Sequence, residues 1–400
     1  MRSVRRERES LNIAIVTPTI AKEGTGPSIC VSALSKQLLD VGHSVTVVTG
    51  DYGGSQIPHD QVQIDARATV KSFPASSGVA RRLYRSSAMR RWMDQQAHSF
   101  DVVDIQGIWS FIAVDAARAC MRARTPYVIT THGQMARWDW KKHWLRKQAF
   151  YHLFLRCPWR LAAAVRFLSE RERSVSVDKA LRNGVVVPNW VERGAERPSE
   201  TKVARMRADL GIPADSRVLL FLGRITDQKG VVEIIRAFKE LCRRRSDCVL
   251  LLVGPMDPEY RTDLEQELVD ARNQRRIIVS QPIYDERKSA LFSLATLFIT
   301  LSKNEGLPLA VLEALANGVP AVVTDKANLP EIVEYDAGVV VPPDPACVGE
   351  QVDRLLSQPT RICSMSQSAR RLIEERFSVD VVFPQLLSVY REALSARLGV

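Results

Sequence analysis

Two glutamates lie in one stretch whose residue types could hold a polar, phosphorylated ligand. The stretch from Asn304 to Asp325 reads NEGLPLAVLEALANGVPAVVTD; Glu305 precedes an apolar run of helix formers and Glu313 lies within it. Because a helix N-terminus favours negative charge and collects anions, carboxylates there could hold hydroxyls beside a bound phosphate. An ordinary loop acid and a glutamate that reaches the surface are the alternative.

A second loop offers two cations for an anion. It reads GRITDQKG over residues 223–230, with Arg224 leaving a predicted strand and Lys229 entering a predicted helix. A guanidinium fork and a compact ammonium can converge on one phosphate, although each could equally form a surface salt bridge. The strand–loop–helix context favours the phosphate. The sequence contains no Asp-x-Asp triplet, so it offers no obvious metal–diphosphate site and we expect no metal or other cofactor.

The first half of the chain contributes a histidine and a glycine turn. His132 directly follows the strand-like run YVITT, and the carboxyl ends of strands in α/β sheets border the ligand crevice. A hydrogen-bonded core histidine is the alternative. Gly24, Thr25 and Gly26 form a turn that either is structural or brings backbone N–H groups to a phosphate or sugar. The full GxGxxG fingerprint is absent, which disfavours NAD binding.

The elements that must position these residues repeat in order along the chain. Short apolar runs predict strands, and helix-like runs follow the two loops. Predicted strands cover 11–17, 45–49, 101–106, 127–131, 163–168, 185–187, 217–222, 248–253, 277–280, 296–301 and 321–324, and predicted helices cover 28–39, 231–243, 309–317 and 378–398. The repeated strand–loop–helix order predicts an α/β fold of two Rossmann-like domains facing each other across a cleft.

Composition fits a chain of this organisation. The 400 residues suggest two domains, possibly three, and 46% apolar with 25% charged residues is ordinary globular usage. The polar segment 191–202, which contains Pro198, is the predicted interdomain linker. Seven scattered cysteines without a CxxC pair favour a reducing compartment. We expect neither a signal peptide nor a membrane-spanning helix, and therefore a cytoplasmic protein.

Positive charge is concentrated in the first half. Residues 1–190 hold 28 Lys and Arg against 15 Asp and Glu, whereas residues 191–400 hold 28 against 30. This asymmetry suggests an anionic partner for the first half: membrane phosphates, nucleic acid or a phosphorylated substrate. The basic segment 81–91 reads as a surface helix or a partly mobile loop.

One basic segment is also rich in aromatic residues. Residues 137–160 interleave four tryptophans with Lys and Arg, and at helical spacing Trp140, Trp144, Phe150 and Phe154 share one side. This pattern is typical of an interfacial membrane helix. The alternative is an amphipathic helix packed on its own domain with a solvated basic face.

Together these motifs resemble the family 4 glycosyltransferases of the GT-B type. The resemblance is carried by GRITDQKG (223–230), the stretch 304–325 with its E-x7-E spacing, THG (131–133) and VPN (187–189). It implies the GT-B fold, in which the last helix crosses back to the N-terminal domain. The implied domains are 1–190 with 378–400, which binds the acceptor, and 191–377, which binds a nucleotide-sugar.

The resemblance also implies roles for individual residues of the second domain. Glu305 would bind hydroxyls of the donor sugar, with the amides of Gly306 and Leu307 nearby, and Glu313 would bind the ribose. Arg224 and Lys229 would neutralise the diphosphate, and Pro282 and Ile283 would meet the base.

In the first domain, the resemblance places His132 by the reacting sugar and the Gly24–Thr25–Gly26 loop on the acceptor and phosphate side. Two positions depart from the family pattern. Trp190 replaces a small residue after Pro188-Asn189, and Pro308 removes an N–H that could have met the donor.

The implied activity is sugar transfer from a nucleotide diphosphate donor to an acceptor, with retention of anomeric configuration. A lipid-linked glycan of polysaccharide biosynthesis and a peripheral position at the inner, anionic face of a membrane are the expected acceptor and location. A sugar-nucleotide epimerase of the same architecture and a non-catalytic nucleic-acid-binding protein are the alternatives. Since the basic residues form no recognised recognition helix or finger, we expect no nucleic-acid partner.

Overall fold

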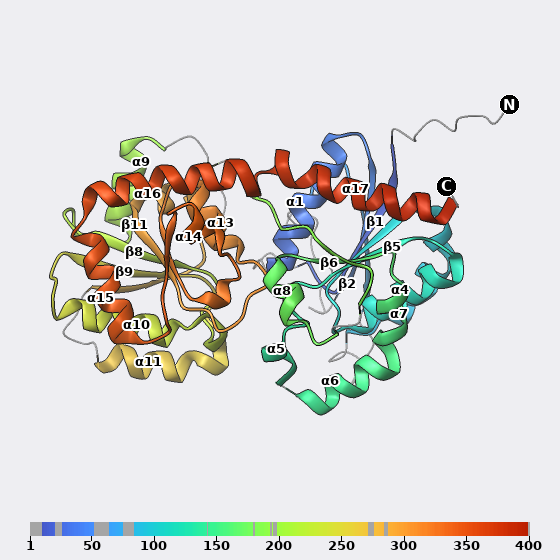
Figure 1. Cartoon of the computed structure of the whole chain (residues 1–400), viewed down its shortest axis with the longest axis horizontal. Coiled ribbons are helices and arrows are strands. Elements are labelled where there is room, and N and C mark those ends of the chain that lie inside the picture. Colours follow the sequence, from blue (N-terminus) through green and yellow to red (C-terminus); the bar gives the residue numbers. More distant parts are fainter. Residues whose placement is uncertain are drawn as a thin grey trace. The chain divides into compact units, whose positions relative to one another are not determined.

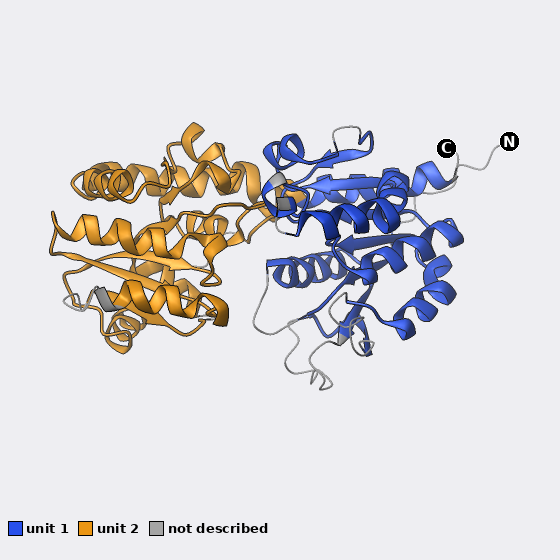
Figure 2. Ribbon diagram, turned by 90° about the horizontal axis from the view of Figure 1, so that it is seen from below, with its two compact units in different colours: residues 1–188, 383–400 blue, residues 189–382 orange. Residues whose placement is uncertain are grey.

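The chain divides into two compact units. In the computed structural model, unit 1 comprises residues 1–188 and 383–400, and unit 2 comprises residues 189–382 (Figure 2). The sequence-based boundaries were placed at 190 and 378. The structure describes residues 10–20, 26–51, 64–74, 84–141, 143–178, 181–192, 194, 198–270, 276–283 and 287–398.

Unit 1 is built on a parallel sheet of seven strands in the order β3-β2-β1-β4-β5-β6-β7. Because helices cover both faces of such a sheet, its strands are apolar runs without polar alternation. The strands are β1 (Asn12–Thr17), β2 (Ser44–Asp51), β3 (Thr69–Pro74), β4 (Val102–Gln106), β5 (Tyr127–Thr130), β6 (Ala164–Phe167) and β7 (Gly184–Val186). The edge strand β3 is mostly exposed and polar, so no apolar run announced it in the sequence.

The helices of unit 1 flank this sheet (Figure 1). They are α1 (Gly26–Asp40), α3 (Ser87–Gln96), α4 (Phe111–Ala123), α5 (Arg137–Lys141), α6 (Trp144–Phe150), a π-helical turn (Tyr151–Leu155), α7 (Arg156–Leu161) and α8 (Glu170–Val175), with a short 3₁₀ turn at Ala97–Ser99. The basic segment 81–91 enters α3 at Ser87, and its residues 81–83 lie outside the described part of the chain.

Unit 2 repeats the arrangement with six parallel strands in the order β10-β9-β8-β11-β12-β13. The strands are β8 (Arg217–Leu222), β9 (Cys248–Val253), β10 (Ile277–Ser280), β11 (Ala295–Thr300), β12 (Ala321–Val323) and β13 (Gly338–Val340). In both sheets the strand order reverses beside the first strand, which is where open α/β sheets bind ligands. The two predicted Rossmann-like domains are therefore confirmed.

The helices of unit 2 lie on both sides of its sheet (Figure 1). They are α9 (Glu200–Asp209), α10 (Val231–Cys242), α11 (Arg261–Asp270), α12 (Arg287–Leu294), α13 (Leu309–Ala316), α14 (Glu331–Glu334), α15 (Pro345–Leu356) and α16 (Pro359–Leu372), with 3₁₀ turns at Asp227–Lys229, Pro258–Tyr260 and Asp325–Ala327 and a π turn at Ile373–Phe377.

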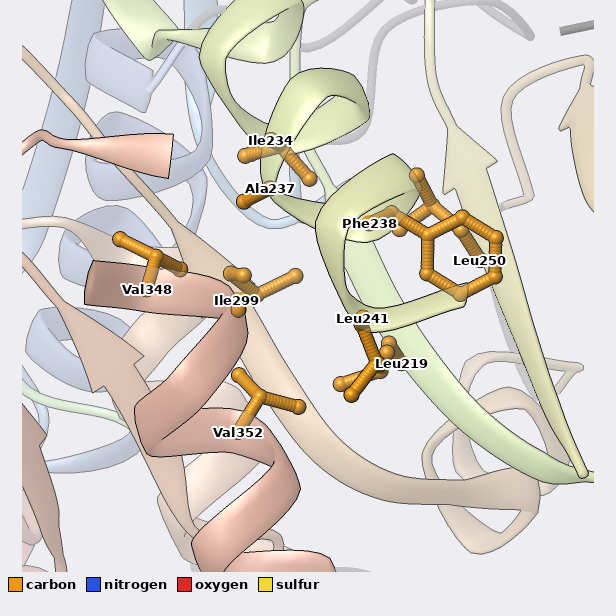
Figure 3. Close-up of a pocket in the computed structure, with 10 residues that line it drawn as sticks. Leu219, Ile234, Ala237, Phe238, Leu241, Leu250, Ile299, Val348 and Val352 are labelled. Carbon is orange, nitrogen blue, oxygen red and sulfur yellow. The ribbon is translucent and has the colours of Figure 1, made fainter. Parts of the chain in front are cut away.

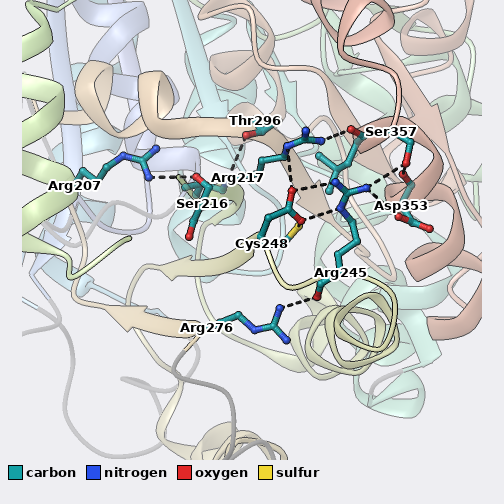
Figure 4. A network of polar contacts seen from close by, with 12 residues as sticks. Arg207, Ser216, Arg217, Arg245, Cys248, Arg276, Thr296, Asp353 and Ser357 are labelled. Atoms are coloured by element: carbon teal, nitrogen blue, oxygen red, sulfur yellow. Dashed lines mark hydrogen bonds and ion pairs between the residues drawn. The ribbon is translucent and has the colours of Figure 1, made fainter. Parts of the chain in front are cut away.

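An arginine network holds the edge of the unit 2 sheet where β8 and β9 begin (Figure 4). Arg245 donates to Asp247 from Nε at 2.9 Å and lies 3.3 Å from the Asp353 carboxylate, while Arg217 Nε lies 3.4 Å from Asp247. This edge is opposite the carboxyl ends of the strands. We therefore read the network as structural support, remote from the ligand edge.

The last helix, α17 (Val379–Leu398), begins in unit 2 and continues into unit 1. Its predicted span, 378–398, is confirmed. Within unit 1 the Tyr390 ring is fully buried, and its hydroxyl donates to Asp104 in β4. The helix is thus bonded to the centre of the unit 1 sheet. Among the described helices, none combines the length and apolar character needed to cross a membrane.

The basic aromatic segment is not one amphipathic helix. His143 adopts φ 62°, which separates α5 from α6, and the π turn interrupts the helical run before α7. Trp140 is only 7% exposed and packs edge-on against Trp109 and Tyr151. For Trp140, which belongs to the core cluster of unit 1, and for Phe150, which packs against it, the structure therefore favours the alternative, a face packed on its own domain. Helical spacing alone could not distinguish a core face from a membrane face.

Candidate active site

In unit 2 the loops after β8 and β11 are joined at the carboxyl edge of the sheet. The N–H of Lys303 donates to Gln228 O at 2.8 Å, and Gln228 Nε2 donates to Asn304 O at 2.9 Å. Gly230 permits this approach. Its φ is 66°, and a Cβ there would lie 2.3 Å from Leu301 O. A glycine is needed on both grounds, the backbone angle and the space.

This junction brings Lys229 and Glu305 together. Lys229 Nζ donates to Glu305 Oε1 at 2.5 Å, and Ser302 Oγ donates to the same oxygen at 2.7 Å. Asn328 Nδ2 donates to the backbone oxygen of Glu305. Glu305 is 8% exposed. The predicted cation and the predicted acid therefore share one small, mostly buried site.

Glu313, which lies in α13, forms a second ion pair. Lys288 Nζ, from α12, donates to both carboxylate oxygens of Glu313, at 2.6 and 2.7 Å. Both side chains are about one quarter exposed, at 26% and 24%. Sequence reasoning missed Lys288, because a lone lysine 25 residues before its partner gives no local signal. Asn328, 23 residues after Glu305, was missed for the same reason, and sequence reasoning also did not single out Ser302.

Pro308 and Gly318 set the limits of α13, as the sequence predicted. Pro308 is the N-cap residue, and the helix runs over Leu309–Ala316. Gly318 adopts φ 74°, and its N–H donates to Leu315 O at 2.9 Å. The proline lacks an N–H, so the first orphan donors of the helix are those beyond it. The first of them, at Leu309, lies four residues after Glu305 in the chain.

The other predicted donor residues occupy different positions around these loops. Arg224 is exposed at the end of β8, and among the described residues no ion pair is seen for it. Gly306 and Leu307 are buried beside Glu305. Pro282 and Ile283 follow the edge strand β10, and Ile283 is 8% exposed. No described contact joins these two to the Lys229–Glu305 pair.

In unit 1 the turn after β5 carries His132. His132 and Gly133 both adopt left-handed backbone angles, φ 49° and 79°. The buried carboxylate of Glu172 holds this turn, accepting from Thr131 Oγ1 and Gly133 N at 2.5 Å each, and from Leu168 N at 2.6 Å. Burial raises the pKa of Glu172, against those three hydrogen bonds. Sequence reasoning did not single out Glu172.

The imidazole of His132 contacts a chain of buried polar side chains. Its Nε2 lies 2.7 Å from Gln106 Oε1, and Gln106 Nε2 donates to Asp104 Oδ1 at 2.8 Å. Burial lowers the pKa of His132 to about 3, with a smaller contribution from the positive charge of Arg166. The ring is therefore neutral at neutral pH. A buried aspartate in an apolar strand, followed by a glutamine at the strand end, is a signal that could have found this chain.

Of the remaining predicted residues in the first half of the chain, the structure describes Gly26 and Trp190. Gly24 and Thr25 lie outside the described residues. Gly26 begins α1, and no heavy atom comes within 4 Å of a Cβ built there. Trp190, which departs from the family pattern after Pro188-Asn189, is 9% exposed and lies in unit 2.

A small pocket in unit 2 does not belong to this site. It lies between α10, α15 and the sheet and is lined by apolar side chains, including Ile234, Phe238 and Val352 (Figure 3). It offers no polar group that could orient a nucleotide or a sugar. Among the described residues, no cluster of three or more His, Cys, Asp or Glu could hold a metal ion.

Two family models match the chain, one in each unit. "Glycosyl transferase 4-like domain" matches residues 25–190, and "Glycosyl transferases group 1" matches residues 202–375. The chain belongs to the family 4 glycosyltransferases. The two matched domains are the GT-B pair that its motifs indicated.

Among relatives of this glycosyltransferase is alpha-D-kanosaminyltransferase of Streptomyces kanamyceticus. The two are 31% identical over 245 residues, which are 58% of this chain and 61% of the relative. The chain thus spans about three fifths of that relative's length.

Solved structures extend the likeness to nearly the whole chain. Sucrose-phosphate synthase from Thermosynechococcus elongatus superposes with a TM-score of 0.79 at 18% identity, over 97% of this chain and 100% of that one. Anabaena HepE, solved in complex with UDP and glucose, gives 0.77 at 18% identity over 94% and 98%. At this identity the likeness concerns the fold.

Proposed function

We propose that this glycosyltransferase moves a sugar from a nucleotide diphosphate donor to a hydroxyl acceptor, with retention of anomeric configuration. The observation that carries the proposal is the Lys229–Glu305 pair, 2.5 Å apart where the strand order of unit 2 reverses. A diphosphate and a sugar are adjacent parts of one donor. A cation for the first and an acid for the second are what such a ligand requires side by side.

Lys229 and Arg224 stabilise the departing diphosphate in this proposal. The leaving group gains negative charge as the glycosidic bond breaks, so positive groups aimed at it lower the barrier. Lys229 is held in place by the loop junction, and the exposed Arg224 can swing toward a phosphate. The N-terminus of α13 adds the dipole of its unpaired N–H groups. This combination supports a reaction that needs no metal ion.

Glu305 and Glu313 bind the donor's hydroxyls. When Lys229 turns toward phosphate, the Glu305 carboxylate is left to accept hydrogen bonds from sugar hydroxyls. Glu313 accepts from the ribose in the same way, and Lys288 keeps its carboxylate oriented from α12. Since HepE was solved with UDP and glucose, UDP-sugars are the first donors to test.

The acceptor proposed is a lipid-linked glycan, reached from an anionic membrane surface. Support comes from the exposed apolar side chains of α6 to α7: Trp144, Leu145, Leu153 and Leu161 are 56–68% exposed. Arg146, Arg156 and Arg160 on the same segment are also exposed. Basic and apolar side chains together suit a surface of anionic headgroups, and we propose a peripheral position at the inner face of the membrane.

Product analysis tests the proposed function. The purified chain is incubated with UDP-, GDP- and ADP-sugars without acceptor, and the products are separated. We expect slow release of nucleoside diphosphate and free sugar from one donor, through transfer to water, and loss of this release in Glu305→Gln. An epimerised nucleotide-sugar with no release would assign the chain to the alternative, a sugar-nucleotide epimerase.

A further inference from the structure

A chain of buried hydrogen bonds runs from the last helix to His132 within unit 1. The Tyr390 hydroxyl donates to Asp104 Oδ2, Gln106 Nε2 donates to Asp104 Oδ1 at 2.8 Å, and Gln106 Oε1 faces His132 Nε2 at 2.7 Å. Thr130 Oγ1 also donates to Asp104 Oδ1, at 3.4 Å. Asp104, Gln106 and Tyr390 are at most 1% exposed, so water cannot replace these partners.

The chemistry of these groups determines which atom donates and which accepts in each hydrogen bond. An ionised carboxylate only accepts hydrogen bonds, so Asp104 draws the NH₂ group of Gln106 toward itself. The amide oxygen must then face His132. Because an amide oxygen only accepts, the ring nitrogen opposite it must carry the proton. This places the proton on Nε2 and leaves Nδ1 with a lone pair, since the ring is neutral.

We propose that Gln106, oriented by Asp104, is a positioning residue that fixes His132 in the Nε2–H tautomer. His132 then presents Nδ1 as an acceptor, which suits a sugar hydroxyl and not an anionic phosphate oxygen. The choice of hydroxyl as the ligand group rests on the proposed function. The tautomer itself rests on the buried hydrogen bonds, on an ionised Asp104 and on a neutral His132 ring, and not on the proposed function.

The backbone of His132 is held independently of this chain. Glu172 fixes the turn on either side of the histidine through Thr131 and Gly133. The side-chain tautomer can therefore be changed at Gln106 or Asp104 while the turn keeps its anchor. Burial raises the pKa of Asp104, opposed by its hydrogen bonds from Tyr390, Gln106 and Thr130 and by the charge of Arg166. A protonated Asp104 would release the amide, which makes the ionised form the testable premise.

Nitrogen-15 NMR of histidine-labelled full-length protein decides the tautomer at neutral pH. The chain has six histidines, and the His132 signals are those lost in His132→Gln. In the wild type we expect a protonated Nε2 and an unprotonated Nδ1. An Nδ1–H tautomer or an imidazolium in the wild type would overturn the proposal, without any substitution in the hydrogen-bonded residues.

Two substitutions then test the cause. Asp104→Asn keeps the size but can orient its amide either way, so we expect both tautomers of His132 to appear. Glu170→Gln is the matched control, because it replaces an exposed carboxylate of α8 outside these hydrogen bonds; we expect the wild-type tautomer. A single Nε2–H tautomer in both Asp104→Asn and Gln106→Leu would show that the chain does not set it.

The spectrum needs no substrate. If the protein released no nucleotide from any donor, the proposed function would be wrong. The spectra would still decide the tautomer of His132. In an active enzyme, we expect kcat in Asp104→Asn to fall in proportion to the fraction of His132 in the wrong tautomer, about twofold where the two tautomers are equally populated.

Discussion

At the scale of single residues, the Lys229–Glu305 pair differs from the many ion pairs on the surface. Exposed pairs contribute roughly 0–1 kcal/mol. The Glu305 side chain is only 10% exposed, and Ser302 gives the same carboxylate oxygen a further hydrogen bond. Removing one partner from such a site leaves a charge without compensation, which costs more than the pair itself is worth. A ligand that takes over one partner must therefore supply a matching group.

The two glutamates should fail in different ways. We predict that Glu305→Gln lowers kcat strongly, whereas Glu313→Gln mainly raises the donor Kd. A lost hydrogen bond to a charged group is worth about 1.5–3 kcal/mol, or roughly 10- to 150-fold. Steady-state kinetics and nucleotide titration measure both effects. Glu334→Gln, which replaces an exposed carboxylate of α14, is the control and should have wild-type kinetics. If Glu305→Gln and Glu313→Gln also had wild-type kinetics, the donor-binding roles of the two glutamates would be wrong.

The cations should make a metal ion unnecessary. We predict that donor turnover persists in excess EDTA, and that Arg224→Ala or Lys229→Ala costs about 2.7–4 kcal/mol of transition-state stabilisation, as for loss of one oxyanion donor. Lys229→Arg should restore part of the rate, because a planar fork does not replace a compact ammonium. Turnover that EDTA abolishes and Mg²⁺ or Mn²⁺ restores would show that this mechanism is wrong.

At the scale of elements, the junction of the β8 and β11 loops decides whether the residues meet. We predict that Gly230→Ala destabilises unit 2 and abolishes donor binding, because its Cβ would collide with Leu301 O. Gly211→Ala is a matched control: Gly211 has φ 67° and no heavy atom within 4 Å of a built Cβ. It carries only the cost of a left-handed alanine, about 1–2 kcal/mol.

Thermal unfolding and nucleotide titration compare the two alanine variants. Gly230→Ala should lower Tm more than Gly211→Ala does, and only Gly230→Ala should lose donor affinity. Equal losses in both variants would mean that the contact with Leu301 does not position the site.

The elements also show where sequence reasoning succeeds. Buried strands of a parallel sheet are apolar runs bounded by turns, so β8, β9 and β10 were predicted with the bounds that the structure has. Glu305 and Lys229 were found because each lies shortly before a predicted helix in a strand–loop–helix pattern. Lys288 and Tyr390 could not be found this way, since their partners are set by tertiary proximity. Trp140 was misassigned because a core face and a lipid face have the same periodicity.

At the scale of the whole molecule, residues 1–190 combine an excess of positive charge with the exposed apolar side chains of α6 to α7. We predict binding to anionic liposomes that weakens at about 1 M salt, where the Debye length is about 3 Å. Leu145→Ser and Leu153→Ser, which replace exposed side chains, should weaken it further. Trp140→Ser should instead destabilise the fold, because that ring is buried.

Val333→Ser is the control for the liposome experiment, since Val333 is 59% exposed and lies in unit 2. It should bind liposomes as the wild type does. The proposal of an anionic membrane surface would be wrong if the protein sedimented equally with neutral and anionic liposomes, or if it sedimented with neither. The glycosyltransferase assignment would stand in both cases.

The most direct test of the central claim compares two ligands at the Lys229–Glu305 site. Calorimetric titration of wild type and Lys229→Ala with a nucleoside diphosphate and the matching monophosphate gives four affinities. We predict that the wild type prefers the diphosphate, and that Lys229→Ala reduces this preference by about 1.5–3 kcal/mol. Lys326→Ala, an exposed lysine that is paired with Asp325, should keep the wild-type preference. The same preference in Lys229→Ala as in the wild type would contradict the account, because Lys229 would then not contact the diphosphate.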